Sequence, residues 1–333
     1  MSDSPVASVI IPLYNKAPHI ARTIRSVLCQ TEQNFEIIIV DGQSTDEGPT
    51  IVRLFEDERI VLLEQRGKGV SSARNEGVSH SESDFIAFLD ADDEWGPNHL
   101  QILLRLREKY PNAGAYTTAY SIISPKSKPR MAVYYGIPGR PWEGLIPSYF
   151  KSAAWGSSPI WTSAVGIPKQ IVEEMGGFAT GVCWGEDIAL WGRIALKYPI
   201  AFSWDGMGIY HIDATNRLSE RYDPVIEHIF ITYARNAFRA GEVPLVLRDD
   251  LMEYLASMQI YTAWHNLTAK RPDLARNNLK GCNVRSLWRS KCWALFWAHI
   301  PPTMFIAAKR YKQLLTQINY NIECNLKKSS SKP

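Results

Sequence analysis

The sequence places three carboxylates within four residues, at Asp90, Asp92 and Asp93. Carboxylates this close repel one another unless a cation neutralises them, and a hard divalent ion with oxygen ligands is the usual partner. Mg²⁺ or Mn²⁺ is therefore the expected cofactor. The alternative is a solvated acidic turn, or a cap on the helix that we expect to begin near Pro97.

The segment at residues 67–75 offers anion-binding chemistry. It combines glycines and hydroxyl groups with the cations Lys68 and Arg74, next to an expected helix N-terminus. Backbone N–H groups at such a terminus and a planar guanidinium both bind phosphate, so the segment could face a diphosphate. A glycine-rich turn with surface charges is the alternative. The chain has no Gly-x-x-x-x-Gly-Lys-Ser/Thr sequence, which disfavours a Walker-type NTPase.

Glu186 and Asp187 stand at the start of a helical pattern. Its expected buried face comprises Ile188, Trp191, Ile194, Ala195 and Tyr198. The helix dipole stabilises anions at this place, so the two carboxylates could serve only as a cap. The functional alternative is that one of them is a general base beside a hydroxyl group that it deprotonates.

Four short apolar runs, at residues 8–11, 35–40, 60–63 and 85–89, alternate with helical periodicity. Nearly continuous apolar runs are typical of parallel strands that are covered on both faces. Ligands of such sheets bind beyond the carboxyl ends of the strands. Because the residues after the first, second and fourth runs are strongly polar, we expect three segments to converge on one edge of the sheet.

Together these motifs resemble the family 2 glycosyltransferases, which have the GT-A fold, over about residues 9–218. The resemblance implies an α/β fold with a Rossmann-like, mixed but mainly parallel sheet flanked by helices. The motifs that carry it, in the family's order, are Ser8 to Asn15, Val40-Asp41 with Ser44-Thr45-Asp46, Gly69 to Gly77, Phe88 to Asp93, and Gly185-Glu186-Asp187 with Leu190-Trp191.

The resemblance also implies roles for single residues on the donor side. The nucleoside would contact Pro12, Tyr14 and Asp41, Arg74 would lie near the diphosphate, and Asp90 would approach the ribose. Many members have Asp-Asp-Gly-Ser after the second strand, whereas this chain has Asp-Gly-Gln-Ser at residues 41–44, so the identity of the base is less secure. The expected substrate-binding residues are Pro12, Tyr14, Asp41, Lys68, Arg74, Asp90, Trp184 and Glu186.

The resemblance implies that Asp92 is a metal ligand and that Asp187 is the catalytic base of an inverting enzyme. In some related enzymes a histidine in the region of His211 reaches the metal, so His211 is the second candidate ligand. A histidine satisfied by hydrogen bonds in the sheet is the alternative. Three tryptophans, Trp155, Trp161 and Trp184, could stack on a sugar ring or simply pack in the core.

Charge is divided unevenly along the chain. Residues 267–333 hold 13 Lys/Arg against two Asp/Glu, a net charge of +11, whereas residues 1–266 have a net charge of −8. We therefore expect two parts with different partners. The first is a catalytic domain at residues 1–218, with a nucleotide-sugar half to about residue 100 and an acceptor half from 101 to 218. The second is a helical C-terminal region at residues 219–333.

The C-terminal region contains an aromatic stretch, residues 292–308, without any Asp, Glu, Lys or Arg. Pro301-Pro302 interrupts this run, which is also shorter than the roughly 20 residues that a spanning helix needs. We expect a helix–turn–helix on an anionic membrane surface. A helical subdomain packed on the catalytic core is the alternative.

Two further features bear on the compartment. The N-terminal residues show no secretory signal, and the five widely spaced cysteines include no Cys-x-x-Cys pair. We expect a cytoplasmic protein that is peripheral on the inner face of the plasma membrane.

The expected activity is transfer of one hexosyl or N-acetylhexosaminyl unit from a nucleoside-diphosphate sugar. A UDP-sugar is the expected donor. The acceptor is a hydroxyl group of a saccharide or lipid-linked saccharide of a surface polysaccharide, and no nucleic acid is involved. The chain lacks the Gln-x-x-Arg-Trp motif and the multiple spans associated with processive synthases. The alternatives are a metal-dependent nucleotidyltransferase and a non-catalytic scaffold that binds sugar nucleotides.

Overall fold

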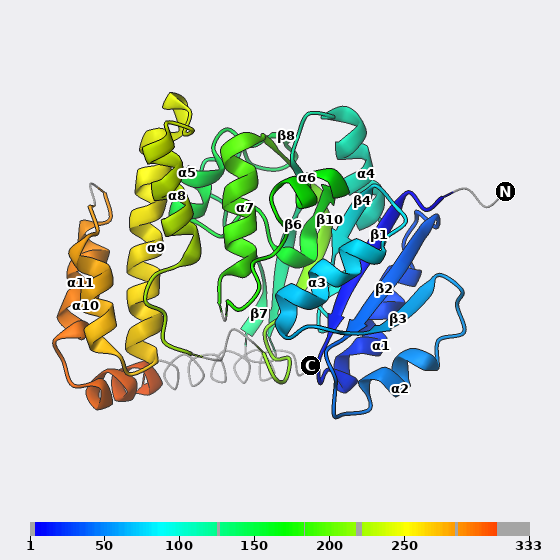
Figure 1. Ribbon diagram of the computed structural model, residues 1–333, viewed down its shortest axis with the longest axis horizontal. Coiled ribbons are helices and arrows are strands. Elements are labelled where there is room, and N and C mark those ends of the chain that lie inside the picture. The colour runs from blue at the N-terminus through cyan, green and yellow to red at the C-terminus, as the bar shows by residue number, and fades with distance from the viewer. Residues whose placement is uncertain (1–3, 125–126, 183, 218–221, 284–285, 312–333) are drawn as a thin grey trace, which may run out of the picture.

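One mixed β-sheet flanked by helices forms the centre of the molecule (Figure 1). The computed structural model describes residues 4–124, 127–182, 184–217, 222–283 and 286–311. Within these ranges the sheet has ten strands, in the order β3-β2-β1-β4-β9-β6-β10-β5, with β7 paired to β6 and β8 paired to β10. The α/β architecture expected from the sequence is confirmed.

The four strands predicted from apolar runs are all present. They are β1 (Ala7–Leu13), β2 (Phe35–Asp41), β3 (Ile60–Glu64) and β4 (Phe85–Phe88). β1 pairs in parallel with both β2 and β4, and β2 pairs in parallel with β3. Their side chains are largely buried on both faces, except in β3 at the edge, as the continuous apolar runs indicated.

The strand register brings the polar strand ends together. Leu13 of β1 lies beside Asp41 of β2, which in turn lies beside Glu64 of β3. On the other side of β1, Ile10 lies beside Phe88 of β4. The segment that follows β4 therefore emerges at the same edge as the segments that follow β1 and β2.

The loop between β1 and the helix α1 (Ala17–Leu28) is tied to the loop after β2. By residue type, Asn15 and Pro18 predict a helix with Asn15 as its N-cap and the proline in its first turn. Pro18 does lie in the first turn of α1, but Lys16 is at the N-cap position, so the prediction for Asn15 is wrong. Asn15 has a positive φ of 51°, and its side-chain oxygen accepts hydrogen bonds from Thr45 instead. The first free N–H of the helix, on Ala17, donates to the carboxylate of Asp46.

The remaining elements complete both layers. In chain order they are α2 (Gly48–Arg53), α3 (Gly69–His80), β5 (Glu94–Trp95), α4 (His99–Lys109), β6 (Ala115–Ser124), β7 (Ser127–Met131), β8 (Glu143–Leu145), α5 (Tyr149–Trp155), η1 (Thr162–Ala164), β9 (Val165–Pro168), α6 (Lys169–Glu174), α7 (Glu186–Lys197), β10 (Ile200–His211), α8 (Ile229–Ala240), η3 (Leu245–Leu247), α9 (Arg248–Thr268), α10 (Pro272–Lys280) and α11 (Trp288–Ala298). The helix predicted after Gly185 is confirmed as α7.

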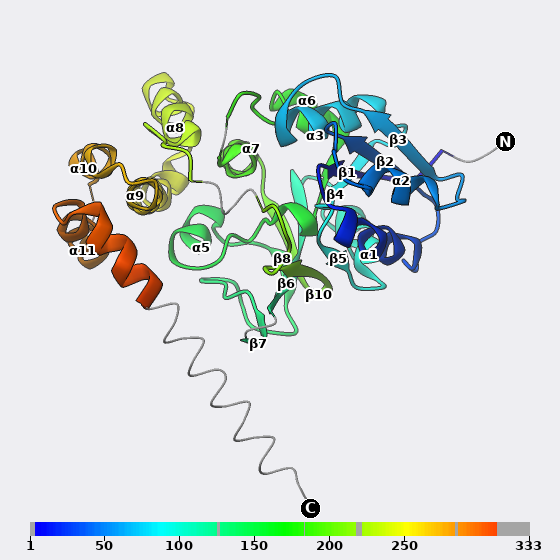
Figure 2. The ribbon, with the colours of Figure 1, turned by 90° about the horizontal axis from the view of Figure 1, so that it is seen from below.

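The first helices of the C-terminal region share a hydrophobic core with the sheet. Trp191 of α7, Phe230 of α8 and Tyr254 of α9 belong to one buried cluster, and the ring of Phe230 stacks on that of Phe150. Both views show α8 and α9 beside α5 and α7 (Figures 1 and 2). These helices therefore pack on the catalytic half, and the domain boundary near residue 218 stays a prediction.

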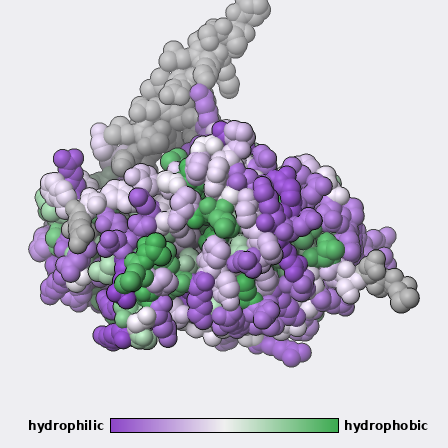
Figure 3. Space-filling model, turned by 90° about the horizontal axis from the view of Figure 1, so that it is seen from above, coloured by the Kyte–Doolittle hydropathy of each residue, from purple (hydrophilic) through white to green (hydrophobic). Residues whose placement is uncertain are grey.

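The last described helices pack on the far side of α9. α10, α11 and the helical residues 302–311 bury a small separate core that includes Leu279, Ala294 and Phe305. The predicted pair of helices around Pro301 is thus confirmed. In the described part of the chain, no helix is long and apolar enough to cross a membrane. Seen from above, the protein surface is mostly hydrophilic, with hydrophobic residues in separate patches (Figure 3).

Candidate active site

A cleft of about 660 Å³ opens at the edge of the sheet where the polar strand ends meet. It brings together most of the residues predicted from the sequence. Those that line it are Pro12, Tyr14, Lys68, Arg74, Asp90, Asp92, Trp184, Glu186 and Asp187. The acidic cluster after β4 and the Glu186-Asp187 pair of α7 therefore face the same space, although almost 100 residues separate them in the chain.

Arg74 of α3 joins these two acidic groups. Its side chain is buried, donating one hydrogen bond to Asp90 over 2.8 Å and another to Glu186 over 3.0 Å. Its guanidinium also lies 5.1 Å from the ring centroid of Phe178. Burial alone would lower the pKa of Arg74, but the neighbouring carboxylates outweigh this effect and raise it. Arg74 is thus a fixed positive charge at the floor of the cleft.

Glu186 and Asp187 have different surroundings although they are adjacent. Burial and the repulsion of Asp187 raise the pKa of Glu186, against the opposing pull of Arg74. Asp187 instead accepts a hydrogen bond of 3.2 Å from the hydroxyl of Thr162. Its carboxylate, which lines the cleft, is not paired with Arg74 by any direct contact in the described residues. Glu186 is thus engaged by Arg74, whereas Asp187 can take up a proton from a bound hydroxyl group.

The short helix η1 links the acidic cluster to the rest of the site. The sequence did not predict this link. The hydroxyl of Ser163 donates to Asp93 over 2.6 Å and accepts from the backbone N–H of Asp90 over 3.1 Å. The second oxygen of Asp93 accepts from the backbone N–H of His211. Burial, with the nearby charges of Asp92 and Asp90, raises the pKa of Asp93 well above its ordinary value. Asp93 is therefore a cross-link between strands.

Asp93 does not cap the following helix. α4 begins at His99, after Asn98, which lies at the N-cap position. The capping alternative considered for the acidic cluster is thus wrong for Asp93. The carboxylate of Asp93 instead accepts hydrogen bonds from Ser163 and from the end of β10. These partners are distant in the chain, so the local sequence could not predict them.

Asp92 forms an ion pair with Lys16, whose Nζ lies 2.6 Å from the carboxylate. The same Nζ donates to the backbone oxygen of Thr215 over 2.7 Å. Among the residues that the structure describes, no three or more His, Cys, Asp or Glu side chains are grouped so that they could hold a metal ion. Mg²⁺ sites often use only one or two carboxylates together with substrate phosphates and water. As a hard oxygen donor in the cleft, Asp92 fits such a role.

Two predicted residues lie away from the described cleft lining. His211 Nε2 is 2.6 Å from the carboxylate of Glu94, and its Nδ1 is 4.0 Å from Asp213. Asp41 accepts weak hydrogen bonds of 3.3 Å from the backbone N–H of Ser44. The metal role of His211 and the nucleoside role of Asp41 stay predictions. The local hydrogen bonds of His211 agree with the alternative considered for it.

The start of α3 presents Lys68 and Gly69 to the cleft. Gly69 has a φ of 81°, in the left-handed region that favours glycine, although a Cβ there would meet nothing within 4 Å. The glycine is thus required by backbone conformation and not by crowding. The free N–H groups of this helix start can bind an anion, with Lys68 beside them.

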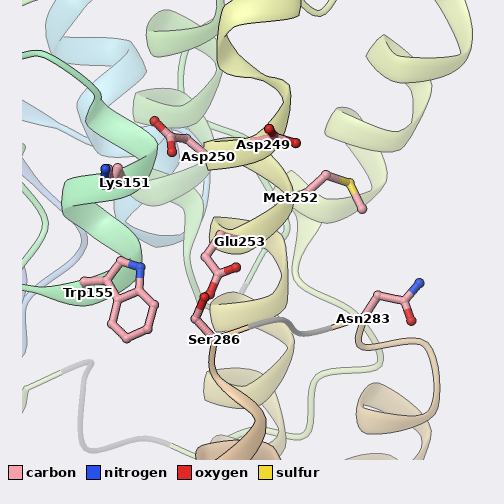
Figure 4. A pocket seen from close by; sticks show the side chains of 8 residues that line it. All are labelled: Lys151, Trp155, Asp249, Asp250, Met252, Glu253, Asn283 and Ser286. Atoms are coloured by element: carbon pink, nitrogen blue, oxygen red, sulfur yellow. The ribbon is translucent and has the colours of Figure 1, made fainter.

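The three tryptophans considered for sugar stacking are not together. Trp161 and Trp184 line the cleft. Trp155, at the end of α5, lies instead in a separate pocket of about 630 Å³. That pocket is formed with acidic residues of α9 and is shown in Figure 4. Apart from Trp155, none of the residues considered for the active site lines this pocket.

The fold defines the class of protein. The mannosyltransferase PcManGT from Pyrobaculum calidifontis, solved with GDP-Man and Mn²⁺, is similar with a TM-score of 0.58 and 19% identity, over 96% of this chain and 88% of that one. An N-terminal part of S. aureus TarS, solved with UDP-GlcNAc, is similar with a TM-score of 0.56 and 16% identity, over 82% of this chain and 87% of that one. The chain has the GT-A glycosyltransferase fold.

The sequence comparison identifies the family. Residues 8–170 match the model of glycosyl transferase family 2, and this part of the chain belongs to that family. The Escherichia coli enzyme WfgD, named UDP-Glc:alpha-D-GlcNAc-diphosphoundecaprenol beta-1,3-glucosyltransferase, is 39% identical over 108 residues, 32% of this chain and 43% of that protein. The matches to three uncharacterized Rickettsia glycosyltransferases cover 31% or less of those proteins.

Proposed function

We propose that the chain is an inverting, non-processive glycosyltransferase that transfers one sugar from a nucleoside-diphosphate sugar to a hydroxyl group. The observation that carries this proposal is the position of Asp187. Its carboxylate lines the same cleft as the acidic cluster, and Arg74 bridges Asp90 to the neighbouring Glu186. The groups proposed to bind the donor and to accept the proton would thus face one space, as the reaction requires.

The donor would occupy the side of the cleft formed by the strand ends. Pro12, Tyr14 and Asp41 would hold the nucleoside, and the start of α3 with Lys68 would hold the diphosphate. A UDP-sugar carrying a hexose or an N-acetylhexosamine is the proposed donor. WfgD is named for UDP-Glc, and TarS was solved with UDP-GlcNAc, although PcManGT was solved with GDP-Man.

Mn²⁺ or Mg²⁺ is the proposed cofactor, with Asp92 as its carboxylate ligand and His211 as a second candidate. A divalent ion supplies positive charge to the departing diphosphate when it is bound. PcManGT was solved with Mn²⁺. Asp90, whose carboxylate is oriented by Arg74, would contact the ribose.

The chain's own residues would carry out the proton transfer. Asp187 would take the proton of the acceptor hydroxyl while that oxygen forms a bond to the anomeric carbon. The bond from the anomeric carbon to the diphosphate oxygen would break, and its electron pair would leave with the nucleoside diphosphate. Attack from the face opposite the diphosphate inverts the anomeric centre. The hydrogen bond from Thr162 would orient the base.

Replacement of Asp187 tests the proposal directly. We expect Asp187→Asn to abolish transfer while UDP binding, measured by calorimetry with Mn²⁺, stays within about twofold. Asp205→Asn, an exposed carboxylate of β10 outside the described cleft lining, is the matched control. Retained turnover in Asp187→Asn contradicts the assignment. Release of pyrophosphate instead of nucleoside diphosphate favours a nucleotidyltransferase, and absence of any product favours a binding scaffold.

The C-terminal helices support a membrane partner. Trp293 of α11 is 57% exposed and stacks on the exposed Phe296, with ring centroids 5.4 Å apart and the planes at 8°. Exposed aromatic residues near basic side chains are typical of proteins that lie on anionic membranes. Arg289 and Lys291 belong to the same helix as the pair, and Lys309 and Arg310 lie in the helical residues 302–311 that follow it. The proposed location is the inner face of the plasma membrane.

A lipid-linked saccharide is the proposed acceptor, because a membrane-bound enzyme meets such an acceptor on the same surface. The name of WfgD includes a diphosphoundecaprenol-linked sugar. We expect the chain to float with vesicles that contain phosphatidylglycerol, and to be released by salt. Trp293→Ala with Phe296→Ala should reduce flotation, whereas Val246→Ala, an exposed apolar side chain of η3, should not. Equal flotation of both variants contradicts the assignment of this surface.

A further inference from the structure

Trp184 is held in one orientation beside the candidate base. Its ring stacks on His265 of α9 with centroids 4.5 Å apart, and it meets the edge of His228 at 5.2 Å. Tyr261 of α9 lies 5.3 Å from it, with the planes inclined at 30°. Trp184 stands directly before Gly185 and the first turn of α7, and it lines the cleft. An ordered aromatic surface thus adjoins Asp187.

Tyr261 lies on the face of α9 that packs against the catalytic half. Tyr254 and Met258, on the same helical stripe, are buried in the main core, and His265 one turn further on is also buried. Tyr261 itself is 60% exposed, and it lines the cleft. A tyrosine that served only to pack α9 would be covered like its neighbours on the stripe. Its uncovered side chain in the cleft points to contact with a ligand.

The cleft has a second aromatic surface. Trp161 and Tyr210 both line it, with ring centroids 5.2 Å apart. Trp161 directly precedes Thr162, whose hydroxyl donates to Asp187. The two aromatic surfaces therefore both lie next to Asp187: Trp184 precedes it by three residues in the chain, and Trp161 precedes the residue that donates a hydrogen bond to it.

We propose that Tyr261 and Trp184 form the subsite for the acceptor saccharide, an inference that rests on the proposed transferase function. The faces of aromatic rings carry negative charge density, which attracts the C–H groups on the apolar face of a pyranose. The hydroxyl groups at the rim of that sugar stay free for solvent, and one of them can reach Asp187. α9 lies outside residues 8–170, so a helix beyond the family segment would help to select the acceptor.

The test uses the full-length chain with UDP-Glc and UDP-GlcNAc as donors and a soluble alkyl-diphospho-N-acetylglucosamine as acceptor. We expect Tyr261→Ala to raise the acceptor KM about tenfold, the loss of one stacking contact. The donor KM and donor hydrolysis without acceptor should stay unchanged. Tyr261→Phe keeps the ring and should stay near wild type. Tyr135→Ala removes an exposed tyrosine outside the described cleft lining and is the matched control.

The outcomes separate this inference from the function on which it rests. An unchanged acceptor KM in Tyr261→Ala, in a chain that transfers sugar normally, overturns the subsite and leaves the transferase function standing. An equal rise in the KM of donor and acceptor also overturns it. Saturation-transfer NMR with the same acceptor needs no turnover. Contact signals that disappear in Tyr261→Ala support the subsite even if the wild-type chain forms no product, which would overturn the transferase function alone.

Discussion

The cleft has a proposed donor side and a proposed acceptor side, which are assembled in different ways. The donor side consists of the loops after β1, β2 and β4 and the start of α3, which neighbouring parallel strands bring together. The acceptor side consists of η1, the start of α7, the end of β10 and Tyr261 of α9. These acceptor-side elements meet only through long-range packing. A local sequence pattern can therefore locate the donor side, whereas the acceptor side depends on the completed core.

The two sides are also joined by different contacts. On the donor side, Lys16 pairs with Asp92, and these side chains are 12% and 14% exposed. Across the two sides, Arg74 pairs with Asp90 and Glu186 in the interior. Removing the partner of a buried charge lowers the free energy of unfolding far more than removing the partner of a partly solvated charge. The bridge through Arg74 should therefore carry most of the coupling between the sides.

Breaking the Arg74 bridge has the largest expected effect. Arg74→Gln leaves the carboxylates of Asp90 and Glu186 without their shared partner, so we expect the free energy of unfolding to fall by about 3–5 kcal/mol. Urea denaturation measures this change. Arg66→Gln is the control, because the side chain of Arg66 is 86% exposed and its ion pair with Glu76 is long, at 3.8 Å. Similar losses in the two variants contradict the view that the interior bridge joins the two sides.

Acid should lower the free energy of unfolding through His228, whose ring lies against Trp184 on the acceptor side. Burial lowers the pKa of His228 from its ordinary 6.5 to about 4. The folded chain therefore binds fewer protons than the unfolded chain between these values, and the free energy of unfolding falls as the pH falls from about 6.5 to about 4. One histidine contributes about 1.4 kcal/mol per pH unit within this window.

The contribution of His228 can be isolated by difference. Burial also lowers the pKa of His99 to about 4. His99 should therefore contribute equally to the pH dependence of the unfolding free energy in the wild type and in His228→Gln. We expect the stability of His228→Gln to depend less steeply on pH than that of the wild type, as measured by urea denaturation between pH 4.5 and 7. Parallel pH dependences would exclude His228 as the acid-sensitive group of the acceptor side.

Loss of the Thr162 hydroxyl should affect chemistry more than donor binding. Thr162→Val keeps the shape of the side chain but removes the donor to Asp187, so we expect kcat to fall about tenfold. The donor KM should stay unchanged, because Thr162 belongs to the acceptor side. Thr162→Ser restores the hydroxyl and should recover most of the activity. A rise in the donor KM in place of a fall in kcat would mean that Thr162 acts on the donor side.

The same division explains what the sequence could predict. The apolar runs and the polar residues after them located four strands and the acidic cluster, because the ends of adjacent parallel strands necessarily meet. Asp187 was singled out by the resemblance to the family's Glu-Asp motif, because its place at the start of an amphipathic helix was equally compatible with a capping role. Thr162, Ser163 and Tyr261 were not found, because each acts across a contact that only tertiary packing creates.

Weak signals for some of these residues were nevertheless present. Tyr254, Met258, Tyr261 and His265 follow the spacing of a helix face, which predicts a packed stripe on α9. That spacing cannot tell where the stripe leaves the core and enters a cleft. Asn15 shows the opposite case, in which the residue type suggests a role that the structure does not bear out. It has the residue type of an N-cap, but its side chain is engaged by Thr45 of the neighbouring loop.

The smallest expected effect concerns the donor side alone. Lys16 occupies one oxygen of Asp92 and places a positive charge where a divalent ion would compete with it. The side chains of Lys16 and Asp92 are 12% and 14% exposed. Loss of this competing charge should be worth about 1 kcal/mol, so we expect Lys16→Ala to tighten Mn²⁺ binding about fivefold. Calorimetry with Mn²⁺ and without donor measures this change. Lys16→Arg keeps the charge and should bind Mn²⁺ like the wild type. Weaker binding by Lys16→Ala would mean that Lys16 orients Asp92 for the ion and does not compete with it, and the donor side would then depend on long-range positioning as much as the acceptor side does.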